Sequence, residues 1–357
     1  MNALTPRGGI RRIGHAALVC VAFVLMQPLL VACVPGQFIG KTARCTHPGI
    51  QSIDVPSDDS VLLFSYCDKD RSYIATSGIF GGAVTVIRRA EDKAIIQKVV
   101  FTPDDKKIFF IERSSRDRSL VRSMDADGSN LQSVTSGGPS TNNVLDIVIS
   151  PDGQRIYYIN AAVFRSYSPV AAARPHDVDF YSMKLDGSDI RKLTNMHAYS
   201  LNGLAISADE SELYYFGGVV DIESGARLGP LPFEPSPMAG IEGKIALWTS
   251  PYPVSDVSED GLLVLASGRM NEPYERFPTE VAGYGLYLHD TAIRLITREI
   301  VWLQDYLDSP TWRNRDDVIY FIRNEMLHGA RNYNHLYRVR VDGSDLKYIR
   351  LDLPQNQ

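Results

Sequence analysis

Two short turn motifs alternate along most of this sequence, and their spacing is the feature that most restricts its fold. The first is Pro-Asp-Gly or a close variant, clearest at Pro151-Asp152-Gly153, and the second is Asp-Gly-Ser, clearest at Asp186-Gly187-Ser188. Each motif lies between short runs rich in β-branched and aromatic residues, which are typical of β-strands. Proline presets φ at the first corner of a turn and glycine permits positive φ, so both motifs predict hairpins.

Both motifs recur at nearly regular intervals. The aspartates of the first motif are 46, 48, 57, 51 and 56 residues apart, at Asp58, Asp104, Asp152, Asp209, Asp260 and Asp316. The second motif recurs at Asp127, Asp186 and Asp342. Six units of about 50 residues, each with four predicted strands, therefore fill residues 50–352, and a unit of this period is typical of a propeller blade. The sequence predicts an all-β fold, a six-bladed β-propeller of four-stranded antiparallel blades, because a two-sheet sandwich would not explain the fixed order of two unlike turns.

The clearest unit also carries a family resemblance. Its pattern Ser-Pro-Asp-Gly-x-x-Ile-x-Tyr (150–158), followed by Tyr-x-Met-x-x-Asp-Gly-Ser-x-x-x-x-Leu-Thr (181–194), resembles the WD-like repeat of TolB-type propellers. TolB adds an N-terminal α/β domain, and relatives of prolyl oligopeptidase add a C-terminal hydrolase domain. The resemblance covers nearly all of the expected mature chain and leaves room for neither addition, which implies a bare propeller.

The N-terminal residues resemble a lipoprotein signal. Three arginines (Arg7, Arg11 and Arg12) precede the apolar run 16–31, which is short for a membrane span and typical of a signal-peptide core. The run ends in Leu30-Val31-Ala32-Cys33, which resembles the lipobox of bacterial lipoproteins and implies cleavage before Cys33 and acylation of it. The residue after Cys33 is Val34, and a residue other than aspartate at this position resembles the pattern of lipoproteins delivered to the outer membrane. The expected location is therefore the bacterial cell envelope, at the outer membrane and facing the periplasm. The alternative is an ordinary secretory signal whose cleavage site abuts a cysteine.

These features predict the organisation of the chain and one disulfide. The expected segments are a signal peptide at 1–32, a lipidated tether at 33–49, the propeller at 50–352 and a tail at 353–357. Of four cysteines, the signal peptide removes Cys20 and lipidation uses Cys33, which leaves Cys45 and Cys67 as an even pair in an oxidising compartment. A disulfide between them is expected, and the alternative is two unpaired buried thiols. No third soft ligand lies nearby, so no zinc site is predicted.

The blade topology predicts two unlike rims. Because strands alternate in direction, both turn motifs lie on one edge, the turn rim, while the links between strands two and three and between blades lie on the other, the loop rim. The loop rim receives the long insertions 112–119, 160–178, 217–243, 267–283 and 323–334. Long loops on a rigid scaffold usually carry binding residues, and arginine with aromatic residues is typical of interface hot spots. The predicted ligand-binding face is Arg113, Arg116, Arg118, Arg165, Tyr167, Arg174, Arg227, Phe233, Arg269, Tyr274, Arg276, Arg323 and Arg331. The alternative is solvated loops without a ligand.

The sequence offers little sign of catalysis. It has no Gly-x-Ser-x-Gly nucleophile elbow, its glycine-rich stretches lack P-loop and Rossmann spacing, and the segment 125–129 lacks the glutamate of a calcium loop. Three histidines, His176, His197 and His328, can reach the loop rim. They support a rival hypothesis, a metal-assisted lyase or hydrolase that acts on acidic glycans, by resemblance to propeller lyases. No metal-ligand motif supports it, so no metal and no cofactor are expected.

The favoured function is therefore a binding or scaffolding module. A net charge of −5 gives no reason to expect a nucleic-acid partner. The expected partners are an envelope protein or peptide at the loop rim and the membrane through the lipid anchor, with a glycan as the alternative ligand.

Overall fold

The structure is a computed structural model in which the described part of the chain contains β-strands and no helix. The described residues are 43, 45, 47–68, 71–91, 93–115, 118–138, 140–165, 174–199, 201–215, 218–229, 254–257, 263–270, 283–290, 295–303, 305–313, 317–325 and 333–354. Cys33 and the expected signal peptide lie outside them. Among the described residues, no helix is long and apolar enough to span a bilayer.

The strands form antiparallel sets of four that follow the order of the chain. Four of these sets are separate four-stranded sheets, and the first and last sets join with β25 (Leu351–Asp352) in one nine-stranded sheet. The first two sets are β1 (Gly49–Asp54), β2 (Leu62–Asp68), β3 (Arg71–Gly78) and β4 (Gly81–Arg89), then β5 (Ile95–Phe101), β6 (Lys107–Ser115), β7 (Arg118–Asp125) and β8 (Gln132–Ser133). The next two are β9 (Val144–Ile149), β10 (Arg155–Arg165), β11 (Arg174–Lys184) and β12 (Arg191–Lys192), then β13 (Leu204–Ile206), β14 (Glu212–Tyr215), β15 (Gly218–Asp221) and β16 (Arg227–Gly229). The last two are β17 (Val254–Val257), β18 (Leu263–Met270), β19 (Gly283–Asp290) and β20 (Leu295–Leu303), then β21 (Tyr306–Arg313), β22 (Val318–Glu325), β23 (Tyr333–Arg340) and β24 (Lys347–Tyr348).

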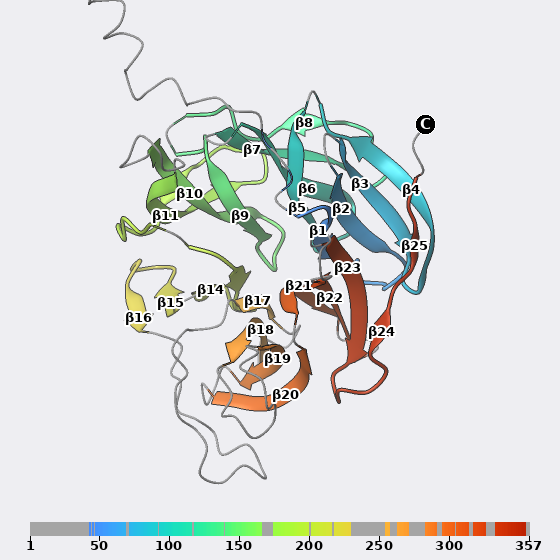
Figure 1. The fold of residues 1–357 in the computed structure, drawn as a ribbon. Helices are drawn as coiled ribbons and strands as arrows, with labels where there is room; N and C mark the ends of the chain where they lie inside the picture. Colours follow the sequence, from blue (N-terminus) through green and yellow to red (C-terminus); the bar gives the residue numbers. More distant parts are fainter. Residues whose placement is uncertain are drawn as a thin grey trace, which may run out of the picture.

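The sheets are arranged radially, with the first strand of each set toward the middle (Figure 1). Each first strand contacts the first strand of the next set: β1 with β5, β5 with β9, β9 with β13, β13 with β17, and β17 with β21. β21 also contacts β1. Four-stranded antiparallel sheets repeated radially are the architecture of a β-propeller, so the all-β propeller class predicted from the repeat is confirmed.

Apolar side chains on both faces of the second strands explain why the sheets stack. In β10, Ile156 and Tyr158 pack toward β6 and β7, whereas Tyr157 and Ile159 pack toward β13 and β14. Since successive side chains of a strand point to opposite faces, a run of consecutive apolar residues requires a neighbouring sheet on each side. Each set therefore depends on the next set for its core.

The repeated motifs build the turn rim through one hydrogen-bonding pattern. In the first turn the Ser150 hydroxyl donates to Asp152 Oδ1 at 2.6 Å, and Gln154 N donates to the same oxygen at 2.9 Å. Thr102 with Asp104 and Ser207 with Asp209 repeat this geometry at 2.7 Å. In the second turn the amide two residues after each aspartate donates to it, at 2.8 to 2.9 Å for Asp127, Asp186 and Asp342. The motifs recur because each aspartate satisfies the backbone of its own turn.

Glycine in the second turn is required by the neighbouring sheet as well as by φ. Gly187 has a φ of +83°, and a Cβ at this position would overlap the carbonyl oxygen of Val134 in the preceding unit. Gly343 approaches the carbonyl of Ile300 in the same way. The turn glycine thus allows the turn of one sheet to pack against the outer strand of the sheet before it.

Two predicted loops are largely extended hairpins. In the predicted insertion 160–178, β10 continues to Arg165 and pairs with β11 from Arg174, so Val163 lies opposite His176. In 112–119, β6 reaches Ser115 and β7 begins at Arg118. Arg118, Arg165 and Arg174 therefore lie at strand ends, whereas Arg116 and Tyr167 are outside the described residues.

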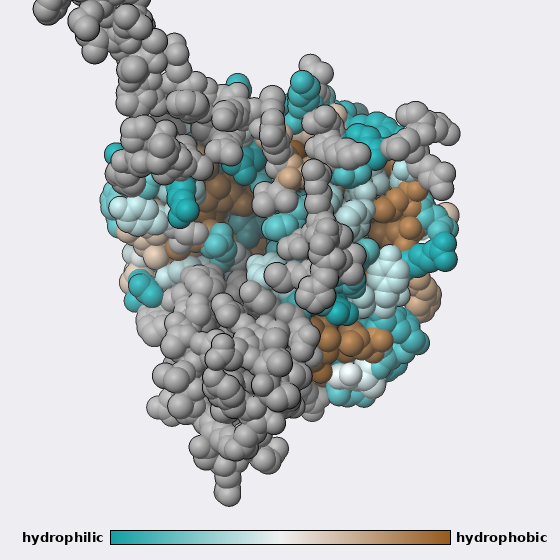
Figure 2. Space-filling view, viewed as in Figure 1, coloured by the Kyte–Doolittle hydropathy of each residue, from teal (hydrophilic) through white to brown (hydrophobic). Residues whose placement is uncertain are grey.

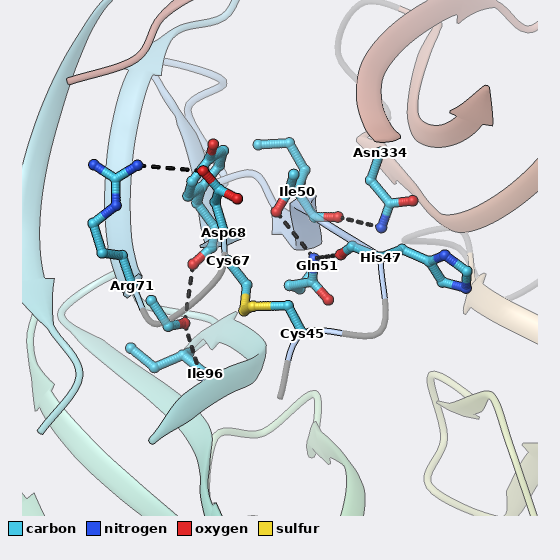
Figure 3. The surroundings of a disulfide bond; sticks show 12 residues. Cys45, His47, Ile50, Gln51, Cys67, Asp68, Arg71, Ile96 and Asn334 are labelled. Carbon is cyan, nitrogen blue, oxygen red and sulfur yellow. Dashed lines mark hydrogen bonds and ion pairs between the residues drawn. A yellow bond between two sulfur atoms is a disulfide. The ribbon is translucent and has the colours of Figure 1, made fainter. Parts of the chain in front are cut away.

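The N-terminal strand β1 pairs with the last sheet, and the C-terminal strand β25 pairs with the first. Gly49 of β1 pairs in parallel with Asn334 of β23, which joins the first and last sets, and β25 (Leu351–Asp352) pairs in parallel with the outer strand β4. Cys45 and Cys67 form a disulfide with a Cα–Cα distance of 6.0 Å (Figure 3). The last sheet is thereby connected to the first through main-chain pairing at Gly49 and at β25.

Candidate functional site at the loop rim

The loop rim is the edge at which second strands end and third strands begin. Within the described residues it comprises the strand ends that flank these hairpins and the described parts of three links: 68 and 71, 115 and 118, 165 and 174, 325 and 333, 90–91, 93–94, 134–138, 140–143 and 194–199. Much of the described surface in Figure 2 is hydrophilic, and hydrophobic colour is limited to a few patches.

A first cluster lies where the β10–β11 hairpin meets the link 194–199. His176 is buried, and its ring contacts the exposed Tyr199 ring edge-on with centroids 4.9 Å apart. Asp177 Oδ1 and His197 Nδ1 are 3.5 Å apart. Asp177 and His197 both have positive φ, of 51° and 48°, although neither is glycine. This conformation is unfavourable for most residues with a Cβ, but aspartate and histidine adopt it more often than others, and Asp105 and Asp189 adopt it in turns of the turn rim as well.

Two arginines from the predicted face extend this cluster. Arg165 and Arg174 are exposed and lie directly opposite each other on β10 and β11. Like charges directly opposite each other on paired strands repel. Arg118, at the end of the adjacent β6–β7 hairpin, is also exposed. Arg113 is half-buried, and its Nε donates to the carbonyl of Ser115 at 3.0 Å, so it orders its own hairpin.

A second cluster lies at the loop rim of the last sheet. Arg323 Nε donates to Asp305 Oδ2 at 2.8 Å, and its guanidinium lies 5.2 Å from the centre of the Tyr337 ring. The Tyr337 hydroxyl donates to Glu325, and burial, followed by this carboxylate, raises the pKa of Tyr337 to about 12. Burial lowers the pKa of His335, which lies beside Glu325. Arg323, a predicted binding residue, lies on β22 and joins the β22–β23 hairpin to Asp305 through the hydrogen bond from its Nε.

Tyrosines connect this second cluster to the first sheet. The Tyr66 and Tyr333 hydroxyl oxygens are 2.7 Å apart, and Tyr66 stacks on Tyr73 with ring centroids 4.8 Å apart. Burial raises the pKa of all three phenols. Sequence reasoning missed Tyr66, Tyr333 and His335. The alternation Tyr333-x-His335-x-Tyr337, which places three rings on one strand face, is the signal that would have found two of them.

Charged side chains from five first strands lie close to the propeller axis, and sequence reasoning missed them too. Lys98 Nζ is 3.5 Å from Asp146 Oδ1. Burial disfavours the charged form of Lys98 and lowers its pKa, but the negative charges of Asp146 and Asp54 have the larger combined effect, so the pKa of Lys98 is raised. Asp308 of β21 also interacts with Lys98. Asp256 completes the group.

Two of these axial aspartates tie neighbouring sheets together. Asp54 Oδ2 accepts a hydrogen bond from the amide of Phe101 at 2.6 Å, and Asp256 Oδ2 accepts one from the amide of Trp312 at 2.8 Å. Each bond runs from one first strand to the first strand of the next set. Because these carboxylates satisfy buried backbone amides, their role is structural.

One predicted residue lies at the other rim. The segment 221–226 forms a turn in which Gly225 N donates to the carbonyl of Asp221 at 2.9 Å, and Arg227 follows it at the start of β16. Val220 and Arg227 are paired, so Arg227 belongs to the turn rim, and its assignment to the loop rim is wrong. This turn has the sequence Asp-Ile-Glu-Ser-Gly instead of Asp-Gly-Ser, which concealed it.

The remaining predicted residues are not placed. Arg269 lies on β18, in a part whose side chains are not described. Outside the described residues lie Arg116, Tyr167, Phe233, Tyr274, Arg276, Arg331 and His328. In the part of the chain that the structure describes, no group of three or more His, Cys, Asp or Glu side chains is arranged to hold a metal ion.

Comparisons with known proteins give structural similarity alone. No family model and no curated protein matches the sequence. A chain of the nidogen–laminin complex is 16% identical with a TM-score of 0.46, and covers 71% of this chain and 79% of its own length. A chain of the mitotic checkpoint complex is 9% identical with a TM-score of 0.48, covering 87% and 83%. A prolyl endopeptidase is 12% identical with a TM-score of 0.49, and this chain spans 51% of its length.

Proposed function

We propose that this protein is a six-bladed, TolB-like β-propeller, anchored by a lipid at Cys33 in the bacterial cell envelope, and that it binds a protein or peptide partner through its loop rim. Six sets of four strands support the blade number, together with the circular order of contacts from β1 through β21 and back to β1. The pairing of Gly49 with Asn334 supports closure between the first and last blades.

The contrast between the two rims carries the binding proposal. At the turn rim, the motif aspartates accept hydrogen bonds from the amides and hydroxyls of their own turns. At the loop rim, Arg118, Arg165 and Arg174 are exposed, and so is Tyr199, of which 66% is exposed. Guanidinium groups and aromatic rings on a rigid scaffold are the usual anchors of protein interfaces.

Sequence features support the anchor. The Leu30–Cys33 motif follows an apolar run of signal-peptide length, and Val34 after the cysteine agrees with delivery to the outer membrane. Replacing Cys33 with serine should abolish labelling by a fatty-acid analogue and leave the precursor uncleaved. Unchanged labelling would contradict the anchor.

The binding proposal is tested with paired variants in a pull-down from envelope extract. Arg174→Ala should melt like the wild type but lose partner, because a hot-spot arginine contributes about 2 kcal/mol, or about thirtyfold in affinity. Arg191→Ala is the matched control, an exposed arginine near the turn rim that pairs with Asp189 at 2.8 Å. Asp152→Ala should lower the melting temperature and leave binding by the folded protein intact. If Arg174→Ala binds normally while Arg191→Ala loses the partner, the binding surface is at the turn rim.

A further inference from the structure

The position at which the N-terminal segment joins the fold determines how an anchored propeller is oriented. Cys67 is close to the end of β2 at the loop rim, opposite Gly49 of β1 and Ser72 of β3. The disulfide therefore fixes Cys45 to the loop rim (Figure 3). Gln51 Nε2 donates to the carbonyl of His47 at 2.8 Å, which holds the chain between Cys45 and β1 against the same edge.

The chain is also fixed two residues earlier. Ala43 N lies 3.5 Å from the carbonyl oxygen of Ser114, near the end of the β6–β7 hairpin, and the Ala43 side chain is buried. It packs in one apolar cluster with Cys67 and with Ile95, the first residue of β5. The chain thus enters the fold between the first two sheets, at the loop rim.

The length of the preceding segment limits how far this edge lies from the lipid. Cys33 and Ala43 are ten positions apart in the sequence, and an extended chain covers at most about 35 Å over ten positions. The nine-residue strand β6 alone runs about 30 Å toward the turn rim. For the turn rim to approach the bilayer, the tether would have to run nearly straight along the whole side of the propeller.

We infer that the anchored protein faces the bilayer with its loop rim, and that its partner is an acidic segment of a membrane-embedded or membrane-anchored protein. This inference rests on the proposed lipid anchor at Cys33. The tether keeps the loop rim, and any partner bound to it, within about 35 Å of the lipid headgroups. The exposed Arg118, Arg165 and Arg174 are positively charged, which matches the carboxylates of an acidic segment.

Energy transfer in vesicles tests the orientation. The full lipidated chain carries one donor dye on Val163→Cys at the loop rim or on Ile190→Cys at the turn rim, and the vesicles contain an acceptor-labelled lipid. Both positions are exposed, at 39% and 46%, at opposite ends of the same sheet. Val163 lies opposite His176 of β11, and Ile190 precedes Arg191, which lies opposite Ser182, so the two dyes are about 20 Å apart in the direction of β11. Transfer should be at least twofold greater from position 163. Equal transfer, or greater transfer from position 190, in protein that carries the fatty-acid label overturns the orientation but leaves the anchor standing. Absence of the label overturns both.

Fractionation tests the partner class. The lipidated wild type should capture its partner from the detergent-solubilised membrane fraction, and the double variant Arg165→Ala/Arg174→Ala should capture at least tenfold less. Added 0.5 M salt should weaken capture by the wild type, since the contact joins opposite charges. A partner recovered only from the soluble periplasmic fraction, and lost in the double variant, would overturn the membrane assignment while supporting binding at the loop rim.

Discussion

The turn rim and the loop rim use the same strands but differ in how their polar groups are satisfied. At the turn rim the motif aspartates bond within their own turns, and the geometry of Asp152 recurs at Asp104 and Asp209. Contacts between neighbouring turns are fewer, as where Asp105 accepts a hydrogen bond from the amide of Ser57 at 2.9 Å. At the loop rim polar contacts join different sheets or links, as with Tyr66 and Tyr333 or Asp177 and His197. The repeated part of the sequence thus builds the scaffold, and the part that does not repeat gives each blade its own surface.

The largest expected effect is at a turn-rim glycine. Gly187→Ala should destabilise the protein by about 3 kcal/mol or more, because positive φ costs about 1–2 kcal/mol and the new Cβ overlaps the Val134 carbonyl. Gly82→Ala is the matched control, with a φ of +91° and no atom within 4 Å of the added Cβ, and should cost about 1 kcal/mol. Urea unfolding measures both. Equal losses would show that packing between sheets at this turn is unimportant.

The next largest effect concerns the loop rim. Replacing both Cys45 and Cys67 with serine opens a loop between residues 22 positions apart and should cost about 3 kcal/mol in the chain-entropy description. The wild type treated with reductant should unfold at the same lowered urea concentration as the double variant. An unchanged unfolding midpoint in both samples would mean that the scaffold does not need this cross-link.

Acid should weaken the turn rim selectively. The hydroxyl of Thr102 and the Lys106 side chain lower the pKa of Asp104 to about 2, and Ser150 lowers the pKa of Asp152. A carboxylate whose pKa is lower in the folded state stabilises that state above its unfolded pKa of about 3.9 and loses the contribution as the pH falls toward the folded value. Stability should therefore fall between about pH 4 and pH 2. Urea unfolding across this range should show a shallower decline for Asp104→Asn, and a parallel decline would refute this role for Asp104.

The smallest effect is expected for the tyrosine contact between sheets. Tyr333→Phe removes the hydrogen bond to Tyr66 and should cost about 1 kcal/mol, since a partly buried hydroxyl loses its partner. Tyr348→Phe, at a half-exposed ring on β24, serves as the control and should leave the melting temperature unchanged. A shift of the same size in both variants would indicate a general response to loss of a phenol.

The turn motifs allowed the fold class to be predicted, because their residues act locally. Asp152 and Asp186 are each satisfied within a few residues, so the spacing of such motifs reveals the repeat directly. Cysteine parity pointed to the Cys45–Cys67 pair for a similarly simple reason.

The site was less accessible to sequence reasoning, because its contacts join distant positions. Lys98 and Asp146 lie 48 residues apart, and Tyr66 and Tyr333 lie 267 apart, so no local pattern brings them together. Arg227 was assigned to the wrong rim because its turn departs from the motif. The hairpin ending at Arg165 was taken for a loop because no turn motif marks its end in the sequence.

The cross-link between Cys45 and β2 also decides how the fold would bear mechanical load. A pull on the chain ahead of Cys45 reaches Cys67 through the sulfur atoms, and β2 is hydrogen-bonded on both sides, to β1 and β3. Without the cross-link, the same pull would act on β1 at Gly49, where a single residue pair joins it to β23. The load is therefore carried by β2, a strand that is hydrogen-bonded on both sides, and the single pair that joins the first and last sheets at Gly49 is not loaded directly.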